Sequence, residues 1–185
     1  MGSRLPLRVQ ADATTKSALA LWREMCEDLY FADAPFKVET NLQGQIIMSP
    51  ASWLHGAYQS EILMLIRKHA DAAGAKGRLI VECAVLTSDG VKVPDVAWVT
   101  AERLKSNQDS MVITSGPQIC VEVLSPSNTM AERSKKATLY FAAGSAEVWL
   151  CGPTGEMTFL EASGERAASA IFPDFPKTVV LEDLG

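Results

Sequence analysis

Residues 118–124, Gln-Ile-Cys-Val-Glu-Val-Leu, are apolar at nearly every position and bear most directly on the fold. A short run that is apolar almost throughout is typical of a strand covered on both faces of a sheet. We therefore expect this stretch to be a central strand. Pro126 ends it, and Thr129 with Glu132 three residues later forms a capping box, which predicts a helix that runs to Ala143.

A second long helix and several hairpins accompany this strand and helix. From Trp53 to about Ala72, apolar residues recur three and four positions apart, which predicts a helix packed on a sheet. Short β-prone runs separated by turn residues predict three hairpins, within residues 36–48, 78–99 and 147–160. We expect a peripheral helix at residues 14–29, a polar loop at residues 101–110 and an edge strand at residues 172–181.

Hairpins interrupted by two long amphipathic helices predict an α/β fold in which helices flank a mixed β-sheet, with additional hairpins, rather than a purely parallel sheet. A chain of 185 residues suits one domain with its own core. We expect residues 1–35 to be an N-terminal extension with a peripheral helix, and residues 36–185 to form the main domain.

The charge of the chain does not favour nucleic acid or an anionic membrane. It has 17 basic and 22 acidic residues, for a net charge of −5, so binding to such partners must depend on a local patch. The clearest candidate for such a patch contains four basic residues and one acidic residue, Asp71. The basic residues are Arg67, Lys68, Lys76 and Arg78. A homodimer is a possible arrangement that would concentrate this patch.

The chain has no apolar run near the roughly 20 residues of a membrane span, and its first residues contain no signal-peptide block. We expect no membrane partner and a cytoplasmic location. The four cysteines contain no Cys-x-x-Cys pair, and they are expected to be reduced core residues. Trp53, Trp98 and Trp149 are interpreted as core or interface residues.

Two acids lie inside runs that the pattern assigns to strands, Asp95 in Val-Pro-Asp-Val and Glu122 in Cys-Val-Glu-Val-Leu. A buried lone carboxylate is costly, so each needs compensation. Asp95 could accept hydrogen bonds from backbone amides, and Glu122 could belong to a core ion pair. Taken together, two carboxylates on adjacent strand ends would suit Mg²⁺ or Mn²⁺, which prefer oxygen ligands.

Hydrolysis at such a site also needs a cation that orients water and stabilises developing phosphate charge. Position 124 shares a face with Glu122, but it holds leucine, so a lysine must come from elsewhere. Lys136, on the helix that follows, could turn back over the end of the strand. The alternative is an ordinary solvated helix lysine.

Several segments, in this order, resemble the Uma-type family of putative restriction endonucleases, in the PD-(D/E)XK nuclease superfamily. The resemblance covers roughly residues 36–182. The segments are Glu39 followed by Gly44-Gln45-Ile46-Ile47-Met48-Ser49-Pro50, His55-Gly56, Val93-Pro94-Asp95-Val96, Val121-Glu122-Val123-Leu124-Ser125-Pro126-Ser127, Lys136 with Tyr140, and Gly144 before Glu147-Val148-Trp149-Leu150.

The resemblance implies a restriction-endonuclease-like core in which Asp95 and Glu122 hold Mg²⁺ or Mn²⁺ and Lys136 replaces the missing strand lysine. It also implies that Glu39 and His55 approach the site as accessory residues. From the sequence, Glu39 could instead be an exposed strand carboxylate, and His55 a polar residue at a helix start. Glu82, on a preceding strand, is expected to be structural.

These residues predict a metal-dependent endonuclease that hydrolyses DNA phosphodiester bonds. The alternative is a catalytically inactive nuclease-fold protein that binds nucleic acid or a protein partner. The net charge favours the alternative, and so do two departures from the family pattern. Gln45 stands where a glutamate is common, and the segment before Lys136 lacks an aspartate.

Overall fold

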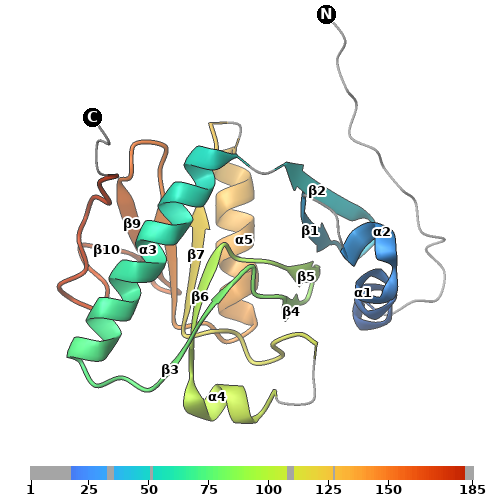
Figure 1. Cartoon of the computed structure of the whole chain (residues 1–185), viewed down its shortest axis with the longest axis horizontal. Coiled ribbons are helices and arrows are strands. Elements are labelled where there is room, and N and C mark those ends of the chain that lie inside the picture. Colours follow the sequence, from blue (N-terminus) through green and yellow to red (C-terminus); the bar gives the residue numbers. More distant parts are fainter. Residues whose placement is uncertain (1–17, 33–35, 51, 108–110, 127, 182–185) are drawn as a thin grey trace, which may run out of the picture.

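The fold is built on a six-stranded mixed sheet (Figure 1). The structure is a computed structural model that describes residues 18–32, 36–50, 52–107, 111–126 and 128–181. The strand order is β10-β9-β8-β7-β6-β3. These strands are β3 (Gly77–Val81), β6 (Val96–Thr100), β7 (Ile119–Val123), β8 (Glu147–Cys151), β9 (Met157–Glu161) and β10 (Gly164–Arg166).

The expected central strand is β7, which has a neighbour on each side and all five of its residues buried. It pairs antiparallel with β6 and parallel with β8. Parallel strands need a crossover connection, and α5 (Met130–Ala142) supplies it. The predicted capping box is present, with Thr129 and Glu132 each accepting a hydrogen bond from the other's backbone amide.

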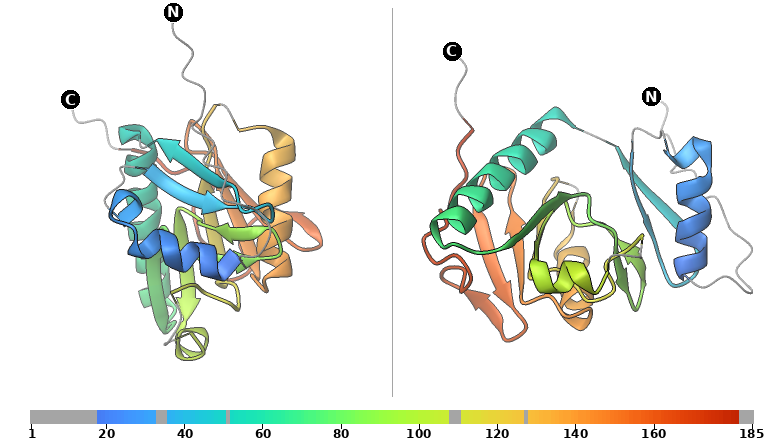
Figure 2. Two further views of the ribbon diagram at one scale, coloured as in Figure 1. Left: turned by 90° about the vertical axis from the view of Figure 1, so that its right-hand side faces the viewer. Right: turned by 60° about the horizontal axis from the view of Figure 1, so that its bottom comes forward.

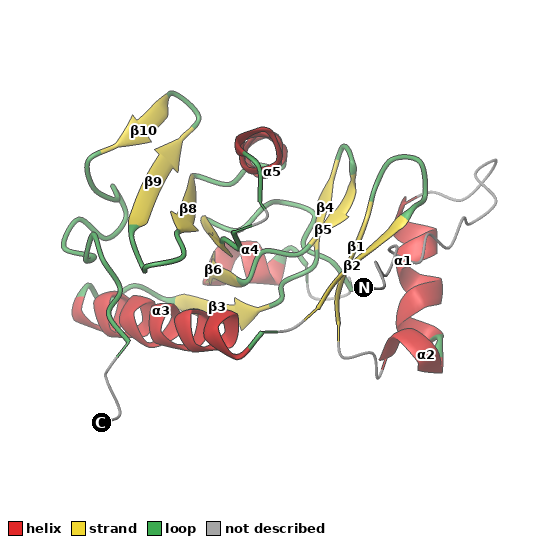
Figure 3. Cartoon of the chain, turned by 90° about the horizontal axis from the view of Figure 1, so that it is seen from above, coloured by secondary structure: helices red, strands yellow, loops and turns green. Residues whose placement is uncertain are grey.

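One long helix covers each face of the sheet (Figure 3). The helix predicted at residues 53–72 is α3 (Trp53–Ala72), which buries Ile62, Ile66 and Ala70 against one face. Helix α5 packs Ala137 and Tyr140 against the other. Successive strand residues alternate between these faces, so Val121 contacts the α3 side while Cys120 contacts the α5 side.

The N-terminal elements form a separate layer beside the sheet (Figure 2). Strands β1 (Phe36–Thr40) and β2 (Ile46–Pro50) make a hairpin of their own. Helices α1 (Ala18–Glu27) and α2 (Leu29–Ala32) precede it, and α1 packs on the hairpin through an apolar cluster of Leu21, Met25 and Ile46. The division of the chain at residue 35 stays a prediction.

Strands β3 and β6 form the hairpin predicted at residues 78–99, but the connection between them is more elaborate than a turn. It contains a small hairpin of β4 (Val85–Thr87) and β5 (Gly90–Lys92). Strand β5 contacts both β1 and α1. This inserted hairpin therefore joins the N-terminal layer to the sheet (Figure 2).

Two sequence-based expectations for the chain's polar and terminal segments were wrong. Residues 101–107 contain a helix, α4 (Ala101–Lys105), whose acidic first turn and basic last turn suit the helix dipole. Residues 172–181 form only an isolated antiparallel bridge between Thr178 and Glu156 and no strand, and β10 forms the edge of the sheet beside β9. Phe172 and Phe175 turn inward onto Trp149, and two prolines nearby cannot donate to a strand ladder.

Cysteine and tryptophan burial largely follows the sequence pattern. Cys83, Cys120 and Cys151 are buried free thiols, whereas Cys26 is exposed. Trp98 and Trp149 lie in the core, but Trp53, at the first position of α3, is 81% exposed. None of the helices in the described part of the chain combines the length and apolarity that crossing a membrane requires.

Candidate active site

Asp95 and Glu122 converge at one end of the β6–β7 pair. Asp95 directly precedes β6, and its backbone amide donates to the Val121 carbonyl at 2.9 Å. Its Oδ2 accepts a 2.6 Å hydrogen bond from the Val123 amide, so Asp95 is fixed to β7 on both sides of Glu122. Both carboxylates are buried, at 1% and 6% exposure. The expected hydrogen bonding of Asp95 to a backbone amide is present.

Lys37 of β1 joins the two acids. Its Nζ lies 2.6 Å from Asp95 Oδ1 and 3.4 Å from Glu122 Oε2. A single ammonium thus contacts both carboxylates. Sequence reasoning missed this lysine, although strand alternation offered a signal, because Lys37 lies two residues from Glu39 and therefore on the same face of β1.

Lys136 enters the site from α5. Its Nζ lies 2.9 Å from Glu39 Oε1 and 3.2 Å from each carboxylate oxygen of Glu122. One helical turn on, the Tyr140 hydroxyl donates to Glu122 Oε1 at 2.6 Å. Lys136 is therefore not the solvated helix lysine of the alternative interpretation, and Glu122 does take part in an ion pair.

Glu39 and His55 both reach the cluster. Glu39 is 7% exposed, and its Oε1 also accepts a 2.9 Å hydrogen bond from the Val93 amide, so it is not an exposed strand carboxylate. His55, in the first turn of α3, places Nε2 3.1 Å from Asp95 Oδ1. The structure thus brings together all five residues singled out in the sequence, Glu39, His55, Asp95, Glu122 and Lys136.

The charges of the cluster support one another. Burial would raise the pKa of Asp95, but the hydrogen bond from His55 and the charge of Lys37 lower it to about 2. Burial would lower the pKa of Lys37 and of Lys136, yet the carboxylates around them, Glu122 foremost, raise both above the ordinary value. Asp95 is therefore ionised and both lysines are cationic at neutral pH.

Tyr140 stays neutral under the same conditions. Burial, followed by the nearby Glu122 carboxylate, raises the pKa of its phenol well above the ordinary value. A neutral phenol donates its proton to Glu122, and this fixes the orientation of that carboxylate. The family motifs in the sequence group Lys136 with Tyr140, but no role was expected of the tyrosine.

These side chains line a cleft of about 510 Å³. Lys37, His55, Asp95, Glu122 and Lys136 all contribute to its wall. A second pocket of about 300 Å³ shares Glu39, Glu122 and Lys136 with the site and has several aliphatic residues in its wall. The acids are thus buried by the fold but open onto a space that a substrate can enter.

Glu82 also lines the cleft, just beyond the end of β3. Its backbone amide donates to the Asp95 carbonyl at 3.2 Å, and the structural role expected of its side chain stays a prediction. Its φ of 49° is the one positive value among the described residues other than glycine. A strained backbone position of this kind is common at functional sites.

The donor set fits a divalent cation. Lys37 already shows that one cation can contact both Asp95 and Glu122, and carboxylate oxygens are the ligands that Mg²⁺ prefers. In the described part of the chain, no group of three or more histidine, cysteine or acidic side chains is arranged to hold a metal. An ion here would complete its coordination with water or substrate oxygens, as Mg²⁺ usually does.

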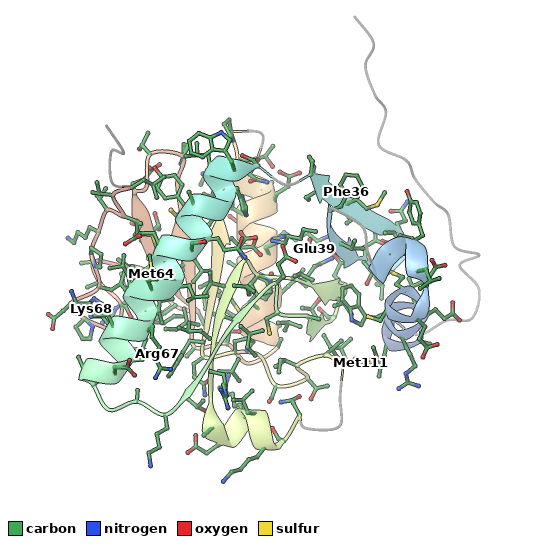
Figure 4. The ribbon with its side chains drawn as sticks, viewed as in Figure 1. Phe36, Glu39, Met64, Arg67, Lys68 and Met111 are labelled. Atoms are coloured by element: carbon green, nitrogen blue, oxygen red, sulfur yellow. The ribbon has the colours of Figure 1, made fainter. Side chains whose placement is uncertain are left out.

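The basic patch lies elsewhere. Arg67 and Lys68 project from the C-terminal half of α3, well away from Glu39 (Figure 4). Arg67 is paired with Asp71 at 2.7 Å, which neutralises part of the patch.

Comparison with known proteins agrees with this architecture. Residues 22–173 match the Uma2 family, described as putative restriction endonuclease. A crystal structure of a putative nuclease belonging to DUF820 from Anabaena variabilis ATCC 29413 superposes with a TM-score of 0.63 at 18% identity, covering 77% of this chain and 87% of that one. This match shows a shared fold, and it confirms the expected restriction-endonuclease-like sheet.

A cryo-EM structure of a DrdV–DNA complex gives a TM-score of 0.35 at 12% identity, covering 61% of this chain and 12% of that one. The search of curated proteins found no match. The family match spans most of the chain and confirms the resemblance carried by its motifs. This protein is a member of the Uma2 family of putative restriction endonucleases.

Proposed function

We propose that this chain is a divalent-metal-dependent endonuclease that hydrolyses phosphodiester bonds of DNA. The observation that carries the proposal is the meeting of Asp95 and Glu122 around one cation, with Lys136 held against the same glutamate. Membership of a family of putative restriction endonucleases supports this class of reaction, and the geometry supports the choice of residues.

Asp95 and Glu122 would hold Mg²⁺ or Mn²⁺. When bound, such an ion polarises a phosphate oxygen and offsets the charge that develops during hydrolysis. Asp95 is prepared for this task because the Val123 amide and His55 fix its carboxylate. Glu122 is prepared because Tyr140 fixes one of its oxygens.

Lys136 is the cation that would orient water and contact the phosphate. Its side chain is 29% exposed, so it reaches the cleft while Glu39 and Glu122 hold its ammonium in position. An ammonium fixed in advance stabilises developing negative charge without having to reorganise during the reaction. Glu39 acts here as a positioning residue, since the Val93 amide fixes it and it in turn fixes Lys136.

Plasmid nicking tests the proposal. We expect the wild-type protein to nick supercoiled DNA in Mg²⁺ or Mn²⁺ and to lose this activity with a chelator. Asp95→Asn and Lys136→Met should each lower the rate by roughly 100-fold or more, as the loss of one fixed catalytic group does. Lys135→Met is the matched control, because this neighbouring lysine is 65% exposed and pairs with Asp89. It should change the rate less than about twofold, because the ammonium of Lys135 is largely exposed to solvent and contacts none of the site acids.

A second candidate function is a non-catalytic binding module. It is favoured by the pairing of both acids with Lys37 and Lys136, because each acid already has a cationic partner without a metal. Titration of Mn²⁺ in a calorimeter separates the two functions. Binding that Asp95→Asn abolishes, with no nicking of plasmid or single-stranded DNA, would favour the binding module over the endonuclease.

A further inference from the structure

One cation in the site has no part in the proposed reaction. Lys37 lies between the two acids, 2.6 Å from Asp95 Oδ1 and 3.4 Å from Glu122 Oε2. Its side chain is 13% exposed and comes from β1, outside the six-stranded sheet that carries the acids. Lys136, by contrast, contacts Glu39 and Glu122 and approaches from α5. The two lysines thus reach Glu122 from different elements and share its Oε2, which lies 3.2 Å from Lys136 and 3.4 Å from Lys37.

We propose that the Lys37 ammonium occupies the position between Asp95 and Glu122 that a divalent ion takes, so that metal binding must displace it. Lys37 is thus an internal counter-ion that offsets part of the negative charge of the two acids until metal arrives. This inference rests on the proposed function, since it assigns the metal to the same two acids.

Distance and charge make the two cations mutually exclusive. A Mg²⁺ ion lies about 2.0–2.1 Å from its oxygen ligands. An ammonium that stays 2.6 Å from Asp95 Oδ1 would share that oxygen with the ion and repel it at close range. The ion can therefore bind both acids only after Lys37 has moved away.

The Lys37 ammonium can also move away from the two acids without disrupting the site. The lysine stem is long and flexible, and β1 has no ladder with the six-stranded sheet. The acids keep other partners when it leaves, since His55 and the Val123 amide hold Asp95 while Tyr140 and Lys136 hold Glu122. Displacement would thus open the position and leave the carboxylates in place.

Calorimetric titration of Mn²⁺ into the whole chain tests this inference. Lys37→Met removes the competing charge, so its Kd for Mn²⁺ should fall by roughly tenfold or more relative to the wild type. Lys135→Met removes the same charge from an exposed position on α5, and its Kd should stay within about twofold of the wild type. Asp95→Asn, alone or combined with Lys37→Met, should abolish binding.

A measurement on the wild-type protein covers the case in which Lys37→Met does not fold. Reductive methylation followed by peptide mass spectrometry reports how accessible each lysine amine is. Saturating Mn²⁺ should increase modification of Lys37 at least about twofold, because the amine leaves a buried position. Modification of Lys135 should not change, and unchanged modification of Lys37 would overturn the inference.

The outcomes separate this inference from the proposed function. If Lys37→Met binds Mn²⁺ no more tightly than the wild type while Asp95→Asn does not bind it, Lys37 is not the competitor, and the nuclease proposal stands. If the wild type does not bind and Lys37→Met does, the inference is supported. If neither protein binds, the metal assignment fails, and the inference fails with it.

Discussion

At the scale of single residues, the site is a balance of buried charges. Asp95 is 1% exposed, and such a carboxylate is tolerated only when it is paired and hydrogen-bonded. Both of its oxygens have partners, since Lys37 and His55 contact Oδ1 and the Val123 amide donates to Oδ2. The ionised form of Asp95 is therefore part of the stability of the fold.

The pH dependence of stability should reveal this contribution. The pKa of Asp95 is about 2 in the folded protein, below its ordinary value of 3.8. The ionised carboxylate thus stabilises the fold above pH 3.8, and this stabilisation is lost as the pH falls from 3.8 through about 2. We expect a free energy of unfolding on the order of 2 kcal/mol greater in the metal-free wild type than in Asp95→Asn at neutral pH, and a shrinking difference below pH 4.

Urea unfolding at several pH values measures this difference. Asp71→Asn is the control, because Asp71 is 57% exposed and its pair with Arg67 should contribute less than about 1 kcal/mol. If the difference in the free energy of unfolding between wild type and Asp95→Asn stayed constant from pH 7 to pH 2.5, the ionised Asp95 carboxylate would not be the source of this stability.

At the scale of elements, the unit β7–α5–β8 positions most of the site. Glu122 lies on β7, while Lys136 and Tyr140 lie one turn apart on α5. The capping box at Thr129 starts this helix, and the Thr129 hydroxyl accepts a hydrogen bond from the Glu132 amide. The beginning of α5 therefore affects where its lysine meets the end of β7.

Removing the N-cap of α5 should destabilise the protein without creating a cavity in its core. Thr129→Ala loses the side-chain hydrogen bond, and we expect a decrease of about 1 kcal/mol in the free energy of unfolding. Thr138→Ala, on the same helix, is the control, because this exposed hydroxyl donates to the Ser134 carbonyl within the helix. It should change stability by less than about 0.5 kcal/mol. If thermal melts showed the same loss of stability for Thr129→Ala and Thr138→Ala, the cap would have no special effect.

At the scale of the whole molecule, the site lies where the N-terminal layer meets the sheet. Lys37 and Glu39 come from β1, whereas Asp95, Glu122 and Lys136 come from the sheet and α5. With a net charge of −5, the chain has little long-range attraction for DNA. Under the proposed function, we expect the lysines in the cleft to provide most of the contact with phosphate.

The salt dependence of DNA binding should locate this contact. Lys68, on the patch predicted from the sequence, lies well away from Glu39 (Figure 4) and does not line the cleft, so Lys68→Ala should change DNA affinity less than about twofold. Lys136→Met should instead weaken binding and reduce the slope of log affinity against log salt by about 1, the change expected for one lost phosphate contact. Fluorescence anisotropy of labelled DNA, with Ca²⁺ in the buffer, measures the affinity of both variants. If Lys68→Ala weakened binding more than Lys136→Met, the DNA would lie on α3.

The features that could be predicted from the sequence depend on neighbours along the chain. The α3 helix follows its apolar spacing, α5 follows its capping box, and β7 follows its apolar run. Asp95 and Glu122 stood out for a similar reason, since an acid inside a strand pattern is visible without any knowledge of its partners. Lys136 was a candidate because its helix directly follows that strand, and the family resemblance then supplied Glu39 and His55.

The partners themselves depend on distant parts of the chain. Lys37 meets Asp95 across 58 residues of sequence, and Lys136 meets Glu39 across 97. Such contacts follow from sheet order, strand register and the docking of the β1–β2 hairpin, which no local pattern specifies. The exposure of Trp53 and the inward turn of Phe172 arise in the same way, because burial depends on what the rest of the fold places beside a residue.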